Sequence, residues 1–378
     1  MKKSVLGRII DENAQTGMVA QQFNLLQLQL QKDPTLAPAI QPQLVALQAQ
    51  LANSDKVRQL LIAEIEKITK RRLLTYFSVY GSMSERDSRI IEDFLYSNKV
   101  TSFDLLLDSP GGFTDAAEKM IKICRMRTGN DTKFDFRTIV VNQAKSAATL
   151  FALGSTKVLL SSTAELGPVD PQIVVFAPNG EKILDSAHQI FYGSQKYIQN
   201  SSGFWNFRRD GDLLLLSKYD PIAIKRSEEA ISHTDDIISK RIYTNPYLKE
   251  GYDNGSTDKN QPIAKIKDQL KVFTEHASSH SHGRPIYYED IKEKGYCINK
   301  FIQKIDDFYV NDEHVDPAQV DKLQELLWEL TIRSLEIVRV SVDPIIDMNG
   351  NQTGINSVAK KLFESSNGLI LTSEPWGQ

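Results

Sequence analysis

Residues 136–162, FRTIVVNQAKSAATLFALGSTKVLLSS, decide the fold class of this chain. An apolar run of strand type stands at each end, and a short helical segment of small residues joins the two. The same alternation of short apolar runs and helical patterns begins near residue 72. Strands that alternate with helices form parallel sheets from βαβ units, so we predict an α/β fold.

The stretch LLLDSPGGF at 105–113 belongs to the preceding βα unit. It has the pattern of a strand that ends in a Pro-Gly-Gly turn and opens a helix. The apolar face of that helix has the spacing i, i+3, i+4 and i+7: Ala117, Met120, Ile121 and Cys124. A glycine pair lets the backbone approach another group closely and exposes N–H donors. An ordinary strand-to-helix turn has the same pattern, so the pair alone does not indicate a site.

Ser146 stands at the start of the helical segment that follows the next strand. One interpretation is a helix N-cap, a position that serine favours. The other is a nucleophile at a helix N-terminus, where unbonded N–H groups face developing negative charge. Parallel strands bring their carboxyl ends to one edge of the sheet. We therefore expect the amides of Gly111 or Gly112 and of Ala147 to surround one oxygen, with Ser146 beside them.

Composition places the chain among ordinary globular proteins. Its 378 residues are 41% hydrophobic and 25% charged, and a formal net charge of −3 with a pI near 6.1 gives no reason to expect nucleic acid or an anionic membrane as partner. The two cysteines imply no disulfide framework and fit a reducing compartment. Charged residues interrupt the apolar stretch at the N-terminus, and no segment has the ~20 apolar residues of a membrane span. We expect a cytoplasmic location and no cofactor.

Three regions follow from the changing character of the sequence. Residues 1–71 are rich in Gln and Leu, and two helical patterns predict a helical hairpin interrupted by three prolines: Pro34, Pro38 and Pro42. The stripe of Val57, Leu61, Ile65 and Ile68 packs either within the chain or on a neighbouring subunit or partner. Residues 72–300 hold the alternating strands and helices. Residues 301–378 hold a C-terminal helix, predicted to end near residue 338, and a tail.

Three motifs occur in order between residues 105 and 295: LLLDSPGG, AKSAATLFALGSTKVLLSSTAELGPVDPQ and SHGRPIYYEDIKEKG. Together with RLLTYFSVYG and the helix after it, the stretch from about 72 to 295 closely resembles the serine dehydrogenase proteinase family. That family shares its fold with the Clp protease proteolytic subunit, signal peptide peptidase A and the crotonases. The resemblance implies a stacked βαβ superhelix, a homo-oligomer and a serine peptidase acting on peptides or proteins. Ser146 takes the nucleophile position, and Gly112 and Ala147 take the oxyanion-hole positions.

A serine hydroxyl needs a group that accepts its proton. In the Clp subunit a histidine follows the serine on the next strand, whereas this chain has Asp170 in ELGPVDPQ. By resemblance, His282 matches a histidine of the family, and Lys196 lies at a separation like that of the lysine base in some signal peptide peptidases. His188 is the nearest histidine after Ser146. We rank His282 first, because a histidine needs the smaller pKa shift, with Asp170 orienting it or capping a turn.

Three other interpretations of the function have less support from the sequence. His276, His280 and His282 lack a standard zinc spacing, so we predict no metal site. A protease-like scaffold without a working base would be catalytically inactive and would bind peptides or partners through its helical N-terminal region. A crotonase-type hydratase or isomerase would share the two-amide oxyanion hole, but it needs no serine at position 146, and no glutamate pair is placed for its chemistry.

Overall fold

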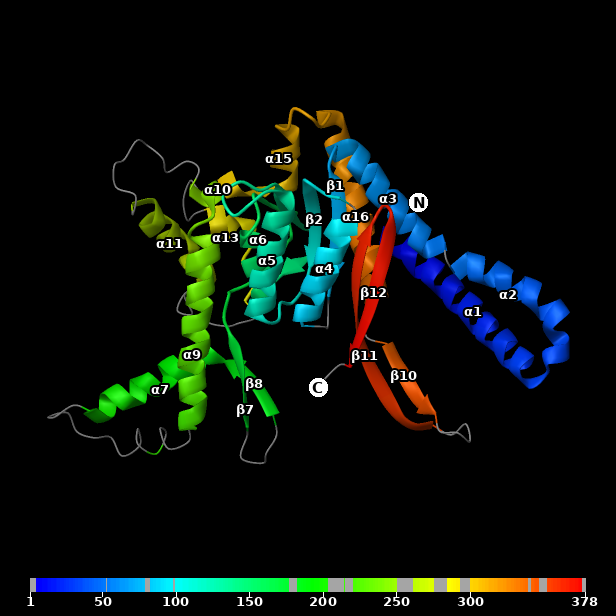
Figure 1. Cartoon of the computed structure of the whole chain (residues 1–378), viewed down its shortest axis with the longest axis horizontal. Coiled ribbons are helices and arrows are strands. Elements are labelled where there is room, and N and C mark those ends of the chain that lie inside the picture. The colour runs from blue at the N-terminus through cyan, green and yellow to red at the C-terminus, as the bar shows by residue number, and fades with distance from the viewer. Residues whose placement is uncertain are drawn as a thin grey trace.

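The computed structural model describes residues 5–51, 53–78, 82–97, 99–176, 182–202, 214, 220–249, 261–274, 284–292, 300–338, 341–346 and 352–375. Over these ranges the chain forms a central sheet with helices packed on both of its faces (Figure 1). The predicted α/β class is therefore confirmed.

The centre of the sheet is parallel, as the alternating pattern predicts. Within the described ranges its strands are β1 (Arg72–Phe77), β2 (Phe103–Asp108), β3 (Phe136–Val140), β5 (Val158–Leu160) and β9 (Ile302–Lys304), and they lie side by side in that order. The first four follow one another in the chain as they do in space, because a helix returns the chain to the starting edge after each strand. Their carboxyl ends therefore share one edge.

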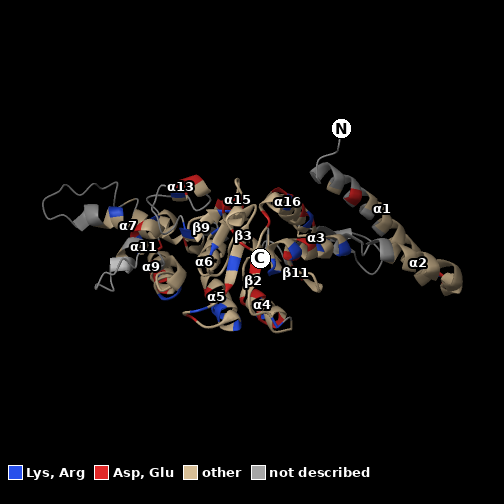
Figure 2. Cartoon of the chain, turned by 90° about the horizontal axis from the view of Figure 1, so that it is seen from above, with Lys and Arg blue, Asp and Glu red and all other residues tan. Residues whose placement is uncertain are grey.

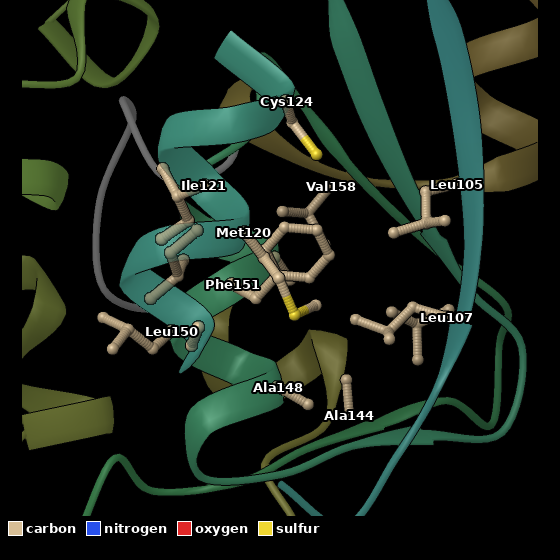
Figure 3. Close-up of a cluster of buried hydrophobic side chains, with 14 of the residues drawn as sticks. Leu105, Leu107, Met120, Ile121, Cys124, Ala144, Ala148, Leu150, Phe151 and Val158 are labelled. Carbon is tan, nitrogen blue, oxygen red and sulfur yellow. The ribbon is translucent and has the colours of Figure 1, made fainter. Parts of the chain in front are cut away.

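Helices cover the two faces of this sheet. One face carries α4 (Glu85–Ser97), α5 (Thr114–Thr128) and α6 (Ala147–Leu153), and the other carries α3 (Asn53–Thr69), α15 (Ile305–Val310) and α16 (Val320–Ile337). Side chains alternate along each strand. In β2, Leu105 and Leu107 point into the core under α5 and α6, where they meet Met120 and Phe151 (Figure 3), while Leu106 belongs to the core on the other face.

The apolar face predicted for the helix after the Pro-Gly-Gly turn is confirmed. Its four members are buried in α5: Ala117, Met120, Ile121 and Cys124. The predicted C-terminal helix is confirmed as α16, which follows a short 3-10 turn at Pro317–Gln319. The stripe on α3 packs within the chain, since Ile65 and Ile68 lie in the same core as α16.

A β-ribbon that sequence patterns missed extends the sheet. It consists of β10 (Ser341–Ile346), β11 (Gln352–Ser365) and β12 (Gly368–Pro375), and β11 pairs antiparallel with β1. Phe363 lies opposite Tyr76, and their rings stack with centroids 4.7 Å apart. The C-terminal tail thus shares one sheet and one core with the strands of region 72–300. The division into three domains stays a prediction.

Further elements lie outside the central sheet and the helices that cover its faces. They are β4 (Gln143–Ala144), β6 (Glu165–Leu166), β7 (Gln172–Phe176), β8 (Lys182–Ser186), α7 (Ala187–Ser202), α9 (Pro221–Ile237), a π-helical turn (Ile238–Ile242), α10 (Pro246–Lys249), α11 (Gln261–Thr274) and α13 (Tyr288–Lys292). Helix α9 begins with a side-chain cap, because the carboxylate of Asp220 accepts a hydrogen bond from the amide of Ile222. None of the helices in the described ranges combines the length and apolar character that crossing a bilayer requires.

The N-terminal region differs from the predicted two-helix pattern. It contains α1 (Val5–Lys32), a 3-10 turn (Pro34–Leu36), α2 (Ala37–Leu51) and α3. Pro34 begins the turn between α1 and α2, but Pro42 lies inside α2, so the prediction that it obstructs a helix is wrong. Proline removes one N–H donor, here the one that would bond the carbonyl of Pro38. Pro38 lies on the exposed surface at the start of α2.

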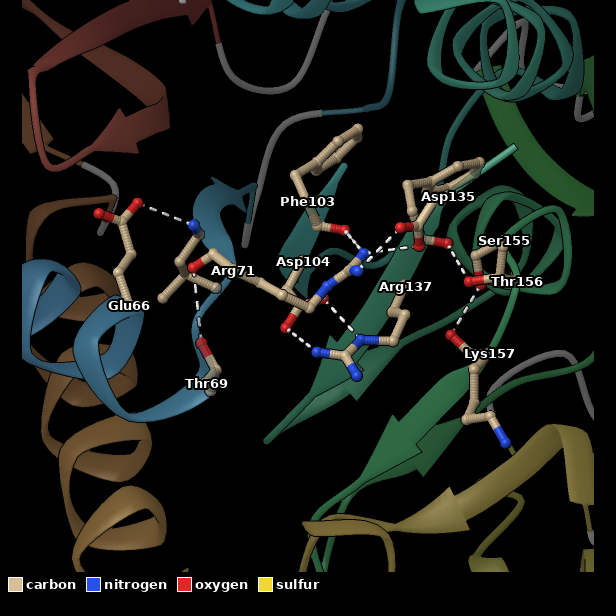
Figure 4. Close-up of polar contacts among 12 residues, drawn as sticks. Glu66, Thr69, Arg71, Phe103, Asp104, Asp135, Arg137, Ser155, Thr156 and Lys157 are labelled. Carbon is tan, nitrogen blue, oxygen red and sulfur yellow. Dashed lines mark hydrogen bonds and ion pairs between the residues drawn. The ribbon is translucent and has the colours of Figure 1, made fainter. Parts of the chain in front are cut away.

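A buried ion-pair network holds the amino ends of the central strands (Figure 4). Asp104 accepts hydrogen bonds from Arg137 at 2.6 and 2.7 Å and from Arg71 at 2.9 Å, and Arg71 continues to Asp135 at 2.8 Å. Burial alone would raise the pKa of Asp104, but the two guanidinium groups outweigh it and lower that pKa. The network ties β1, β2 and β3 together at the edge opposite to their carboxyl ends.

Candidate active site

Three segments that leave the carboxyl edge of the sheet lie side by side. The amide of Ser109 donates to the carbonyl of Gln143 at 3.1 Å, and the amide of Lys145 donates back to the carbonyl of Ser109 at 3.0 Å. Strand β4 pairs in parallel with β6 on its other side. The segments after β2, β3 and β5 therefore converge, as expected for neighbouring strands of a parallel sheet.

Ser146 occupies the N-cap of α6 in a strained conformation. Its φ of 51° and ψ of −120° lie outside the regions that L-residues favour, and its side chain makes no capping hydrogen bond. The interpretation of Ser146 as an ordinary capping serine is therefore wrong. Ser146 is buried, with 7% of the residue exposed. Strain of this kind is typical of functional positions.

The Gly-Gly turn packs directly against Ser146. A methyl group added at Gly111 would lie 2.8 Å from the Cβ of Ser146 and 3.0 Å from the amide nitrogen of Ala147. Gly111 and Gly112 adopt φ values of 104° and 149°, in the region that favours glycine. The two loops thus approach as closely as the sequence pattern predicted, and only glycine permits that contact.

Two backbone amides at this contact lack hydrogen-bond partners among the described residues. The amide of Gly111 donates to the hydroxyl of Ser109 at 3.1 Å, so it is already used. The amides of Gly112 and Ala147 have no such partner within the described part of the chain. Of the two glycines named from the sequence, Gly112 is therefore the better oxyanion-hole candidate. Ala147, the first residue of α6, adds the positive end of the helix dipole.

A supporting segment that sequence analysis missed holds the Gly-Gly turn from behind. The amide of Met83 donates to the carbonyl of Gly111 at 2.7 Å, and the amide of Phe113 donates to the carbonyl of Met83 at 2.9 Å. A methyl group added at Gly112 would lie 2.2 Å from the nitrogen of Met83. No local sequence signal marks Met83, because its role comes from a bridge to a residue 29 positions later.

A buried lysine from the C-terminal ribbon fixes that segment in turn. Lys361 on β11 donates to the carbonyl of Ser82 at 2.6 Å and to the carboxylate of Asp87 at 2.9 Å. Asp87 also accepts from the amide of Ser84 at 2.7 Å and from the hydroxyl of Tyr76 at 3.1 Å. Lys361 and Asp87 are both fully buried. The residues on either side of Met83 are thus anchored by charge-assisted hydrogen bonds.

Asp170 and His188 form a second buried polar pair. The Nδ1 atom of His188 lies 2.6 Å from a carboxylate oxygen of Asp170. The cause is local: β7 and β8 form an antiparallel hairpin, and the amide of Ala187 donates to the carbonyl of Pro171 at 2.9 Å. The hairpin returns the chain to its starting point, so residues 18 positions apart meet. The ring of His188 also stacks on Tyr192.

The chain places this pair near the serine. Gly167 packs on Lys145, since a methyl group added there would lie 2.9 Å from the Cβ of Lys145. Asp170 follows three residues later, and three residues span at most ~10 Å. Asp170 therefore lies within about 10 Å of Gly167, which packs on the residue before Ser146.

The other two candidate bases are Lys196 and His282, and the structure describes only the first. Lys196 is an exposed residue of α7. His282 lies outside the described residues, as do His276 and His280, so its role stays a prediction. No cluster of three or more metal-ligating side chains occurs among the residues that the structure describes.

Asp108 is a buried carboxyl group at the end of β2, three residues before Gly111. Burial raises its pKa to about 7, and the side-chain amide of Asn142 and the backbone amide of Gln143 offset this only in part. The group therefore titrates near neutral pH directly behind the Gly-Gly turn.

Comparison with known proteins places this geometry in a family. The model of the ClpP-like SDH-type serine proteinases matches residues 12–189. An uncharacterized protein of Methanocaldococcus jannaschii is 31% identical over 317 residues, which cover 82% of this chain and 90% of that protein. The chain belongs to this family. The matched range contains Gly111, Gly112, Ser146, Asp170 and His188.

More distant similarities cover less of the chain. A second uncharacterized protein of the same organism is 26% identical over 155 residues, which cover 37% of this chain and 50% of that protein. Two mutants of the 1510-N membrane-bound stomatin-specific protease, one in complex with a substrate peptide, are 18% and 19% identical. Each covers 33% of this chain, and the matches span 64% and 61% of their own chains, with TM-scores of 0.23 and 0.22.

Proposed function

We propose that this ClpP-like SDH-type proteinase is an active serine peptidase with Ser146 as its nucleophile. The observation that carries the proposal is the strained φ of 51° at Ser146, whose hydroxyl does not cap α6 while the Gly-Gly turn packs against it. A capping serine would need neither the strain nor the close glycine contact. A nucleophile beside two unbonded amides accounts for both, because strain gathers at functional positions and an oxyanion hole needs amides close to the nucleophile.

In the proposed reaction the Oγ atom of Ser146 attacks the carbonyl carbon of a peptide bond. The carbonyl oxygen becomes an oxyanion, and the amides of Gly112 and Ala147 donate to it. The serine proton passes to the base and then to the leaving amine, which departs as the C–N bond breaks. A water molecule hydrolyses the acyl-enzyme through the same steps in reverse order.

For the base we propose His188 rather than His282. Its support is the 2.6 Å contact with Asp170, which orients a histidine through Nδ1 and directs Nε2 to proton transfer. The environment of His282 lies outside the described residues, and Lys196 is exposed.

A fluorophosphonate probe tests the proposal. Wild-type protein is expected to be labelled, Ser146→Ala is expected to be unlabelled, and the exposed Ser162→Ala serves as the matched control that labels like wild type. His188→Ala should slow labelling by about 100-fold or more, the usual contribution of a general base. His282→Ala and Lys196→Ala should label within about twofold of wild type.

Other labelling results would change the assignment of the base or contradict the proposed activity. A large loss in His282→Ala with normal labelling of His188→Ala would return the base to His282. Absence of labelling in folded wild-type protein would contradict the enzyme and favour a catalytically inactive scaffold. A homo-oligomer and a cytoplasmic location remain part of the proposal, and size-exclusion chromatography with light scattering and cell fractionation test them.

A further inference from the structure

The N-terminal arm, residues 13–51 of α1 and α2, extends away from the sheet and its helices (Figures 1 and 2). It is attached at its base, where α2 leads into α3 and where Glu12 pairs with Arg333 of α16 at 2.7 Å. Beyond that ion pair the helices of the arm pack mainly on each other.

The arm carries almost no charge. Between Asn13 and Ser54 the charged residues are Lys32, the last residue of α1, and Asp33, which caps the turn after it. Glutamine is its commonest polar residue. Figure 2 shows these helices almost without the charged residues that mark the rest of the surface. Solvent-facing helices usually carry many charges, whereas the centre of a protein interface is depleted of them.

Helix α1 presents two apolar stripes instead of one. The half-buried stripe consists of Val19, Phe23, Leu26 and Leu30. The second stripe consists of Met18, Leu25 and Leu28, which are 63%, 61% and 52% exposed. Its members are spaced by seven and three residues, the spacing of a helix–helix seam. On α2, Val45 is 66% exposed.

The arm buries too little to be stable by itself. Over residues 21–48 the buried side chains are Ile40 and Leu47. In proteins most of the stability of a helix comes from the packing of its apolar face rather than from helix propensity. The outer stripe of Met18, Leu25 and Leu28 is thus an exposed apolar surface, of the kind that marks an interaction site.

The composition of the arm favours one kind of binding partner for the outer stripe. A charged partner would lose hydration on this surface and gain no opposite charge. An amphipathic membrane-binding helix needs several Lys or Arg residues along its polar face, and the arm has a single lysine, at the end of α1. Glutamine amides both donate and accept, so such a surface complements itself. A second copy of the chain is also the one partner that is always present.

We propose that the arm is a self-association element. The outer stripe of one arm packs on that of a second copy, related by a two-fold axis, and the two helical hairpins form a four-helix bundle. The proposal concerns assembly and is independent of whether Ser146 is active.

Sedimentation velocity of the full-length protein tests this. The mass of wild type is expected to be at least twice that of the double variant Leu25→Lys/Leu28→Lys. Ile222 is also apolar and exposed, on α9, so Ile222→Lys is the matched control and should keep the wild-type mass. The milder Leu25→Ala/Leu28→Ala, which keeps helix propensity, should raise the dissociation constant by about tenfold or more.

Three outcomes would overturn the proposal. The wild type could be monomeric at all concentrations while circular dichroism shows helical arms. The lysine variant could keep the wild-type mass although its near-ultraviolet spectrum shows a folded body. The wild type could cosediment with phosphatidylcholine vesicles while its mass in their absence equals that of the lysine variant, which would make the occupant a lipid surface.

Discussion

The loops around Ser146 and the N-terminal arm are stabilised in opposite ways. Near Ser146 the backbone is held by buried charges with several partners each, such as Lys361 with Asp87 and the carbonyl of Ser82. The arm has almost no charge, and its helices bury few side chains. The difference shows that ion pairs within the chain fix the backbone of the first region, whereas the second leaves apolar side chains such as Leu25 and Leu28 exposed.

Breaking the buried ion pair behind the Gly-Gly turn should have the largest effect on stability. Lys361→Met leaves Asp87 as a buried charge without its counter-ion, which costs about 3–5 kcal/mol of unfolding free energy. The neighbouring Lys360→Met, at a half-buried site, should cost less than ~1 kcal/mol. Urea unfolding measures both, and a second substitution, Asp87→Asn, should recover part of the loss in Lys361→Met. Equal losses at 360 and 361 would contradict this account of the region.

A substitution in the Gly-Gly turn should mainly reduce the rate at which Ser146 reacts. In Gly112→Ala the added methyl group meets the backbone of Met83, so the amide of Gly112 has to move. Loss of one oxyanion donor reduces acylation by about 100- to 1000-fold, and we expect that reduction in the rate of fluorophosphonate labelling. Gly368→Ala is the control, because a methyl group added there meets nothing within 4 Å. Similar rates for the two variants would exclude Gly112 as a donor.

The pH dependence of stability tests the buried carboxyl group behind the turn. The pKa of Asp108, about 7 in the folded protein, lies above its ordinary value of 3.8, so the folded state holds this proton more tightly than the unfolded state. Its stabilising contribution is complete below pH 4 and is lost as the pH rises through 7. Between about pH 5 and 6.5 this amounts to about 2 kcal/mol.

Replacing the carboxyl group should remove that dependence. Unfolding free energies of Asp108→Asn are expected to change less than those of wild type over the same pH range. The exposed Asp93→Asn should follow wild type. Parallel pH profiles for wild type and Asp108→Asn would show that Asp108 ionises normally.

Substitutions in the N-terminal arm should have the smallest effect on the reactivity of Ser146. Leu25→Ala/Leu28→Ala should change the labelling rate of Ser146 by less than about twofold, since the arm packs mainly on itself and shares few contacts with the sheet. A large change would show that assembly through the arm also completes the site, and would remove the contrast between the two regions.

Sequence patterns predicted the parts of this protein that depend on neighbouring residues. The alternation of strands and helices, the apolar face of α5 and the meeting of the Gly-Gly turn with Ser146 follow from periodicity and from the parallel order of the strands. The sequence favours a capping role for Asp170 as strongly as an orienting role. It gives His188 less support as the base than His282 or Lys196. The pairing of His188 with Asp170 needs the β7–β8 hairpin, which brings together two residues 18 positions apart.

By itself the sequence determined the α/β class, the nucleophile candidate and the two loops that meet around it, because side-chain periodicity and glycine freedom act over a few residues. Only the tertiary structure decided that Gly111 uses its amide on Ser109, that Lys361 anchors the segment before Met83, and that Asp170 contacts His188. These contacts join residues that are distant in sequence or depend on the exact path of the backbone. Such contacts arise when buried polar groups find partners during packing, and no local pattern records which partner each one finds.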